Sequence, residues 1–375
     1  MKRFTLLLIA WVCVGTMADA CTSAIVSGRI TANGRPLLWK NRDTDDQNNR
    51  VERVPAHDGL LEFVALFDAR DLRDTAAWIG FNEKGFAIMN TASYNINDDG
   101  GDAGSLMDQE GVLMRHALER CATVDDFERL LNTLPKPLGV EANFGVIDAH
   151  GNGAYFETGN FSYHKYDLAD SPDGLLTRTN YSYSGTTDQG NGYIRELSER
   201  ALLAPHLARR DFTPATFTEE LSRTFFHAML GKDFTHSGDE WLVDQDFIPR
   251  RISTASIVIE GVLPGEPPEL TTMWVALGYP PCAEVMPAWT GPAGVPDVLK
   301  GTGPLNHSTQ ADKVQQRKAE VFSISRGNGQ HYLNLSKLYN EQGTGYCQML
   351  EPVNRQAYEN GYRELARRRA MLLKR

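Results

Sequence analysis

The sequence lacks the short motifs that mark several common enzyme classes. It contains no HExxH, no paired CxxC, no GxxxxGK[ST] and no GxSxG pattern, so zincin, zinc-ribbon, P-loop and serine-hydrolase interpretations have no support. Its five cysteines and nine histidines are scattered, and no Cys–His pair of the papain type stands out among them. We therefore expect neither a metal site nor a cofactor.

The sequence also has fewer basic than acidic residues. The 38 Lys and Arg residues are outnumbered by 48 Asp and Glu residues, which gives a formal net charge of −10. This balance argues against nucleic acid or an anionic lipid surface as the main partner. A hydrophobic share of 41% and a charged share of 23% exclude a low-complexity chain or a multi-span membrane protein. With 375 residues, the chain has room for one large or two medium domains.

The one long apolar stretch lies at the start of the chain and is too short to span a bilayer. Two basic residues precede it, it runs from Phe4 to Val14, and the small residues Ala18 and Ala20 follow at the −3 and −1 positions of a cleavage site. This order is typical of a secretory signal peptide. The sequence predicts a signal peptide over residues 1–20 and export to the periplasm or the medium, with no membrane span.

Cleavage after Ala20 would leave Cys21 as the first residue of the mature protein. In a bacterial lipoprotein such a cysteine is acylated, but Ala18 and Asp19 stand where that processing prefers Leu and a small residue. In an N-terminal-nucleophile hydrolase the thiol attacks an amide carbonyl and the neighbouring α-amino group, with a pKa of about 7.7–8.0, takes its proton. A cysteine that merely follows the cleavage site is the third interpretation.

The residues after Cys21 predict a β-hairpin that returns to it. Two short apolar runs, Ala24–Val26 and Pro36–Trp39, flank an Asn33-Gly34 turn. A hairpin of this length brings Asp43 back near Cys21. There the carboxylate could hold the protonated amine and orient the thiol, although a solvated loop acid would fit the same spacing.

These residues resemble the cysteine N-terminal-nucleophile amidohydrolases. That superfamily includes choloylglycine hydrolases, penicillin V acylases, acid-ceramidase-like enzymes and the isopenicillin N acyltransferase and carcinine hydrolase group. The resemblance extends from Cys21 to Arg200 as an ordered series of short motifs. It rests on Cys21-Thr22, the Asn-x-Asp that ends at Asp43, and three later stretches, residues 80–91, 142–157 and 176–181.

The resemblance implies roles for further residues. Asn90 takes the place of a main-chain oxyanion-hole donor, and Asn180 that of the asparagine whose side chain completes the hole. Arg195 is the candidate for the arginine near the nucleophile, and Lys40 stands where the choloylglycine branch usually has arginine. Arginine and lysine differ in that the lysine lacks a planar fork of donors.

Substrate-binding candidates are the cation and the aromatic residues near these motifs. Aromatic side chains at such positions could line an acyl pocket, although they are more often part of a protein core. The candidates are Lys40, Trp78, Phe81 and Tyr181.

The fold implied by the resemblance is α+β, a four-layer αββα sandwich with two antiparallel sheets between helical layers. Blocks of predicted strands alternating with paired helices suit this architecture better than a doubly wound sheet. We expect residues 21–375 to form a single domain with a helical C-terminal extension over about 306–375. Helices are expected over Val124–Leu134, with Thr123 as N-cap, and over Pro214–Leu230; the last strand is expected at Thr271–Leu277.

The sequence thus predicts an exported hydrolase that cleaves a linear, non-peptide amide through Cys21 and an acyl-enzyme. The expected partner is a small-molecule amide substrate, and a homo-oligomer is left open. A dipeptidase or acyltransferase with the same nucleophile is the alternative, and a Cys21-lipidated binding protein is the alternative from another class. Cys282 and Cys347 are expected to lie in Pro/Gly-rich loops, and whether they form a disulfide is also left open.

Overall fold

The computed structural model describes residues 21–96, 106–324 and 331–374. The predicted signal peptide, residues 1–20, lies outside the described residues. Among those that are described, no helix combines the length and the apolar character needed to cross a membrane.

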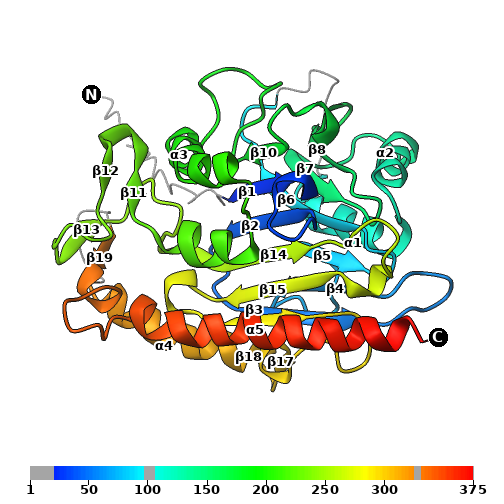
Figure 1. The fold of residues 1–375 in the computed structure, drawn as a ribbon. Helices are drawn as coiled ribbons and strands as arrows, with labels where there is room; N and C mark the ends of the chain where they lie inside the picture. Colours follow the sequence, from blue (N-terminus) through cyan, green and yellow to red (C-terminus); the bar gives the residue numbers. More distant parts are fainter. Residues whose placement is uncertain (1–20, 97–105, 325–330, 375) are drawn as a thin grey trace, which may run out of the picture.

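Two antiparallel sheets form the centre of the molecule (Figure 1). The six-stranded sheet has the order β10 (Leu175–Arg178), β1 (Thr22–Val26), β2 (Leu37–Asp43), β14 (Ser253–Glu260), β15 (Thr272–Leu277) and β16 (Val285–Ala288). The seven-stranded sheet follows chain order: β3 (Asn49–Val54), β4 (Phe63–Asp68), β5 (Ile79–Asn82), β6 (Ala87–Ala92), β7 (Ala142–Ile147), β8 (Gly153–Thr158) and β9 (Tyr163–Asp167).

Helices and short strand pairs complete the fold. The α-helices are α1 (Glu110–Arg120), α2 (Val124–Thr133), α3 (Tyr193–Arg209), α4 (Thr309–Val321) and α5 (Tyr346–Leu372). The short pairs are β11 (Phe226–His227) with β12 (Lys232–Asp233), β13 (Trp241–Val243) with β19 (Tyr332–Asn334), and β17 (Gly301–Thr302) with β18 (His307–Ser308). In Figure 1, α5 runs the length of the molecule below β15, and α2 lies at the opposite side from β11 and β12.

The period-two alternation of strand side chains explains the layers. On β2, Leu38 points into a core shared with Val64 and Met89 of the seven-stranded sheet. Its neighbour Trp39 points the other way, into a core that includes Trp274 of β15. Each sheet therefore has two buried faces, one against the other sheet and one against helices.

The outer layers are helical on both sides. Leu118 of α1 and Phe127 of α2 pack on the seven-stranded sheet. On the six-stranded sheet, Tyr358 of α5 stacks against Trp274, with ring centroids 4.7 Å apart. The predicted α+β sandwich of two antiparallel sheets between helical layers is confirmed.

Predictions of single elements are confirmed where cap or turn residues mark the end of a helix or strand in the sequence. The helix predicted after Thr123 is α2, and Thr123 Oγ1 accepts from Asp126 N at 3.1 Å while Asp126 Oδ2 accepts from Thr123 N at 2.9 Å. This reciprocal capping box fixes where the helix begins. The hairpin predicted after Cys21 is also present, with Ala24 paired to Trp39 across β1 and β2.

Two predictions are wrong. A continuous helix over Pro214–Leu230 does not form, because a π turn and a 3-10 turn end at Thr224, which adopts an extended conformation. This irregular turn brings Ser222 Oγ within 2.8 Å of Ser256 Oγ on β14. The strand at Thr272–Leu277 is not the last one, since β16, β17, β18 and β19 follow it.

Stability is expected to depend strongly on Phe127. This fully buried ring lies between Phe86, Phe144 and Phe156, at centroid distances of 5.2–6.3 Å. We expect Phe127→Ala to lower the free energy of unfolding by about 3–5 kcal/mol, because a cavity remains in the core. Urea unfolding measures the change, with Leu72→Ala as the control at a side chain that is 72% exposed. Equal effects of the two substitutions would contradict this assignment of the core.

Candidate active site

Strand register brings Cys21 and Asn180 together. In the antiparallel pair of β1 and β10, Ser23 lies opposite Arg178, so continuing the register places Cys21 opposite Asn180. The Cys21 main-chain nitrogen donates to Asn180 Oδ1 at 2.8 Å. Two residues 159 positions apart are thus joined through the ladder that begins immediately after Cys21.

Arg195 lies beside this contact, as the resemblance implies. Its Nη1 donates to the Cys21 carbonyl oxygen at 2.7 Å and to Thr22 Oγ1 at 2.8 Å, and its Nη2 donates to Asn180 Oδ1 at 2.8 Å. Burial and the nearby Arg250 guanidinium lower the pKa of Arg195 to about 10, so it remains charged at neutral pH. The guanidinium thereby holds Cys21 and Asn180 in one rigid arrangement.

The Asn180 side chain makes contacts that the sequence did not predict. Its oxygen accepts from Cys21 N and Arg195, and its Nδ2 donates to the Ala92 carbonyl oxygen at 2.9 Å. Asn180 therefore anchors the nucleophile candidate to the end of β6. Its contribution to an oxyanion hole stays a prediction.

Asp43 returns beside Cys21, and its main-chain oxygen lies 4.0 Å from Cys21 Sγ. Its carboxylate accepts two bonds from Arg250, from Nε at 3.0 Å and from Nη2 at 2.9 Å. It also accepts from Asn41 Nδ2 at 2.9 Å and from Ser253 Oγ at 2.5 Å. The carboxylate is thus fixed in position, while its action on the Cys21 amine stays a prediction.

Sequence reasoning missed Arg250. Burial works against its charge, but the Asp43 carboxylate outweighs this and raises the pKa of Arg250. Arg250 lies 207 positions from Asp43, just before β14, which pairs with β2. No local motif marks it, because only the pairing of these two strands brings it to Asp43.

Lys40 and Arg42 of β2 lie on the same face of the six-stranded sheet, because they are two positions apart on the strand. Lys40 points toward the seven-stranded sheet, where its Nζ donates to Asn90 Oδ1 at 2.8 Å and to the Trp78 carbonyl oxygen at 3.0 Å. Arg42 points the same way, bonds Asp68 at 2.8 Å and lies 4.9 Å above the Trp78 ring. The predicted residues Lys40, Trp78 and Asn90 therefore lie together.

A cavity of about 630 Å³ opens at this point between the ends of the strands. Four of the predicted site residues line it besides Asp43: Cys21, Lys40, Trp78 and Asn90. A volume of this size suits a small-molecule ligand. Its lining is strongly charged, with ten acidic or basic side chains: Lys40, Arg42, Asp43, Asp45, Asp46, Asp68, Arg70, Asp108, Glu110 and Glu141.

Two predicted substrate-binding residues do not line the cavity. Phe81 is fully buried in the core between the sheets, because β5 lies within the seven-stranded sheet. Tyr181 lies outside the cavity, stacked on Tyr193 with ring centroids 4.1 Å apart. Both aromatic side chains pack against protein, which is the alternative that the sequence had left open.

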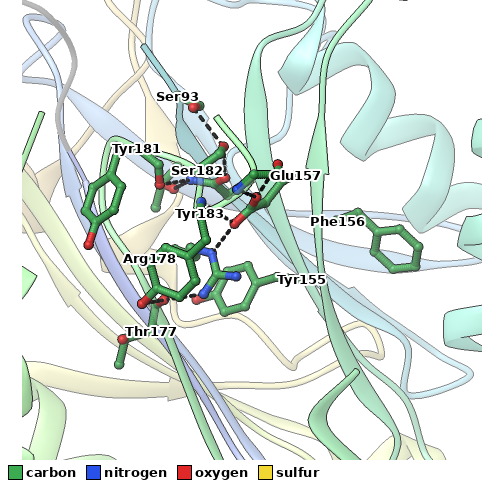
Figure 2. Close-up of polar contacts among 12 residues, drawn as sticks. Ser93, Tyr155, Phe156, Glu157, Thr177, Arg178, Tyr181, Ser182 and Tyr183 are labelled. Carbon is green, nitrogen blue, oxygen red and sulfur yellow. Dashed lines mark hydrogen bonds and ion pairs between the residues drawn. The ribbon is translucent and has the colours of Figure 1, made fainter. Parts of the chain in front are cut away.

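A buried ion pair supports the segment that carries Asn180 (Figure 2). Arg178 Nε bonds Glu157 Oε1 at 2.6 Å, and the guanidinium lies 3.7 Å above the Tyr183 ring. Glu157 also accepts from the main-chain nitrogens of Tyr183 and Ser184 at 2.8 and 2.7 Å. Both chain directions from Asn180 are thus tied to one carboxylate on β8.

The free cysteines other than Cys21 are buried structural residues. Cys282 and Cys347, for which the sequence left a disulfide open, are free thiols in this structure, and Cys347 lies in α5. Burial raises the pKa of Cys347 to about 11 and that of Cys121 to about 12. Among the described residues, no group of three or more His, Cys, Asp or Glu side chains is placed to hold a metal ion.

Comparison with known proteins gives a family match for part of the chain. Residues 75–235 match the model of the acyl-coenzyme A:6-aminopenicillanic acid acyl-transferase family. The match covers less than half of the chain, and over these residues the chain is similar to that family. Asn90, Asn180 and Arg195 lie within the match, whereas Cys21 and Asp43 lie outside it.

Solved structures of three other proteins are similar to parts of this one. The Caenorhabditis elegans N-acylethanolamine-hydrolyzing acid amidase ortholog is 16% identical, with a TM-score of 0.44 over 65% of this chain and 94% of that one. A mutant Clostridium perfringens conjugated bile acid hydrolase is 11% identical, with a TM-score of 0.37 over 68% and 89%. Penicillin V acylase from Agrobacterium tumefaciens is 10% identical, with a TM-score of 0.38 over 72% and 86%. Comparison with curated proteins gives no match.

Removing the Arg250 guanidinium should destabilise the protein. Arg250→Gln leaves the buried Asp43 carboxylate without its forked partner, so we expect the free energy of unfolding to fall by about 3 kcal/mol. Arg355→Gln, in an exposed pair with Glu351, serves as control and should cost less than about 0.5 kcal/mol. Urea unfolding compares them, and adding Asp43→Asn to Arg250→Gln should restore part of the loss. No recovery in the double variant would contradict the proposed pairing.

The Glu157 carboxylate offers a second test of how the site is held. Glu157→Gln should cost about 3 kcal/mol, because Arg178 is left as a buried charge without its ion-pair partner. Glu128→Gln on the same side of the molecule breaks a partly exposed pair with Lys165 and should cost less than about 1 kcal/mol. Thermal and urea unfolding of both variants measure the difference, and equal costs would rule out the assigned role.

Proposed function

We propose that the protein is exported and hydrolyses a linear amide, with Cys21 as its N-terminal nucleophile. Removal of residues 1–20 turns the Cys21 main-chain nitrogen into an α-amine. The observation that carries the proposal is the position of that nitrogen, 2.8 Å from Asn180 Oδ1, on a cysteine that lines the charged cavity. An α-amine there lies on the same residue as the thiol that it would deprotonate.

In the proposed reaction the α-amine takes the thiol proton and the thiolate attacks the amide carbonyl carbon. Asn180 Oδ1 accepts from the amine and holds it in position. The C–N bond then breaks, the amine returns the proton to the leaving nitrogen, and a thioester to Cys21 remains. Water, deprotonated by the same amine, cleaves the thioester and releases the acid.

Fixed charges around the thiol support this chemistry. Arg195 and Arg250 are two buried or largely buried cations beside Cys21, and both favour the thiolate form that attacks. We assign the oxyanion to the Asn90 main-chain N–H and the Asn180 amide. A donor so placed contributes about 2.7–4 kcal/mol to the transition state.

Acyl transfer is the second candidate, because the matched family model is described as an acyl-transferase. It differs from hydrolysis in the last step alone, where an amine takes the place of water. We favour hydrolysis because an exported enzyme meets water at far higher concentration than any acyl acceptor. Partition between acid and hydroxamate products in the presence of hydroxylamine distinguishes the two.

The N-terminus provides the decisive test. Intact-mass measurement and N-terminal sequencing of protein from the exporting cell should give a chain that begins at Cys21. Iodoacetamide at pH 7.5 should add a single group, on Cys21, since burial raises the pKa values of Cys121, Cys282 and Cys347 and keeps those thiols protonated. A diacylglyceryl-modified Cys21, or a mature start elsewhere, would overturn the mechanism.

Catalytic activity should also depend on Cys21. In a panel of acyl amides and dipeptides we expect Cys21→Ser to lose 10²-fold or more of the turnover, because a hydroxyl is a weaker nucleophile at neutral pH. Cys121→Ser serves as the matched control, since Cys121 is buried between α1 and the seven-stranded sheet. Retention of full activity by Cys21→Ser would exclude Cys21 as the nucleophile.

A further inference from the structure

The two residues to which the oxyanion is assigned belong to different sheets. Asn90 lies in β6 of the seven-stranded sheet, and Asn180 follows β10 of the six-stranded sheet. Strand pairing fixes the position of a residue within its own sheet only. Donors to an oxyanion must converge on one point, so contacts between the sheets have to set the separation of these two residues.

Asn143 of β7 lies at the place where such contacts are needed. In the ladder of β6 and β7 it is the residue opposite Thr91, which directly follows Asn90. Its Nδ2 donates to Thr91 Oγ1 at 3.0 Å. The side chain is thereby tied to the strand that carries the first of the two proposed donors.

The same amide nitrogen also holds the chain on both sides of Asn180. Asn143 Nδ2 donates to the main-chain oxygen of Thr179 at 3.2 Å and to that of Tyr181 at 3.1 Å. These two carbonyl groups belong to the residues immediately before and after Asn180. One side chain therefore joins the segment of the second proposed donor to the strand of the first.

The orientation of the Asn143 side chain is itself fixed. Its Oδ1 accepts from Ser182 Oγ at 2.6 Å, and Ser182 Oγ lies 2.8 Å from Ser93 Oγ (Figure 2). Asn143 is fully buried, so rotation of its side chain would leave polar groups unsatisfied away from water. Asn143 is not part of the described lining of the cavity, and it therefore acts on a ligand only through its neighbours.

We infer that Asn143 is a positioning residue that sets the separation of the Asn90 main-chain N–H and the Asn180 amide, and so shapes the oxyanion hole. The inference rests on the proposed function, since it concerns the same reaction. A reacting group that is misplaced by about 1 Å can lower a rate by about 10²-fold. Loss of the Asn143 donors should therefore slow attack on a carbonyl group while leaving the binding of the ligand nearly unchanged.

Two reactions of the Cys21 thiolate separate this role from an effect on the thiol. With 4-nitrophenyl hexanoate, the thiolate attacks the ester carbonyl carbon, negative charge develops on the carbonyl oxygen, 4-nitrophenolate leaves and a thioester remains. With iodoacetamide, the thiolate displaces iodide from a saturated carbon and no oxyanion forms. The amount of thiolate affects both rates equally, so the ratio of acylation to alkylation reports oxyanion stabilisation.

Asn143→Asp keeps the size of the side chain but removes its N–H donors. We expect the acylation rate to fall about tenfold or more and the alkylation rate by less than about threefold. Alkylation changes little because Arg195 still holds the Cys21 carbonyl oxygen, at 2.7 Å. Stopped-flow release of the first equivalent of 4-nitrophenolate measures acylation, after subtraction of the Cys21→Ser rate, and intact mass measures alkylation.

Asn82→Asp is the matched control. Asn82 is also fully buried and lies in the same sheet, and its Nδ2 donates to the main-chain oxygens of Leu118 at 2.8 Å and Cys121 at 2.7 Å. These contacts tie β5 to the end of α1 and not to the Asn180 segment. The control should lose stability in urea unfolding as Asn143→Asp does, but keep the ratio of acylation to alkylation.

Ser182→Ala is a milder variant that decides the question if Asn143→Asp does not fold. It removes the hydroxyl that donates to Asn143 Oδ1 and leaves the Asn143 donors in place. We expect it to lower the ratio about threefold or more, because Asn143 is then less firmly oriented. An unchanged ratio in the folded variants, or an equal loss in Asn82→Asp, overturns the inference.

Failure of the proposed function gives a different result. If the ratio falls in Asn143→Asp but no amide in the panel is cleaved, the hydrolase proposal falls and the role of Asn143 stands. If amides are cleaved and Asn143→Asp keeps kcat, the hydrolase stands and the inference is wrong; the expected result is a lower kcat with KM nearly unchanged. If Cys21 reacts with neither reagent, both proposals fall.

Discussion

The hydrogen bond between the Cys21 main-chain nitrogen and Asn180 Oδ1 is the contact on which the site depends. It exists because β1 and β10 are neighbours in one sheet with a register that sets the two residues opposite each other. Arg195 binds both partners, so the nitrogen and the carboxamide share one cation. A shift in the register of β1 and β10 would separate Cys21 from Asn180.

Fixed charges are the second organising feature. Asp43 is held by Arg250, and Asp68 by Arg42, at the places where the two sheets end close together. Behind the Asn180 segment, Glu157 and Arg178 form a pair that is almost fully buried. Such pairs cost desolvation energy and add little net stability, but they allow few alternative arrangements of the groups that they join. In this molecule they hold three separate segments around one cysteine.

The charged lining also distinguishes this cavity from a pocket for a purely apolar acyl chain. Trp78 offers an aromatic wall, but Arg42 lies over its ring and its indole nitrogen donates to Asp68 at 3.1 Å. The apolar surface near Cys21 is therefore bordered by ion pairs rather than by aliphatic residues. Solvation of these charges favours polar ligands.

The sequence by itself determined the elements whose boundaries are local. The hairpin after Cys21, the capping box at Thr123 and the alternation of strands and helices follow from turn and cap residues a few positions apart. It also indicated Cys21, Asp43, Asn180 and Arg195, because the motifs keep their order along the chain. Only the tertiary structure decided that Arg250 holds Asp43, that Phe81 lies in the core and that acidic residues line the cavity. These features come from contacts between segments up to 207 residues apart, and sequence spacing does not encode which strands become neighbours.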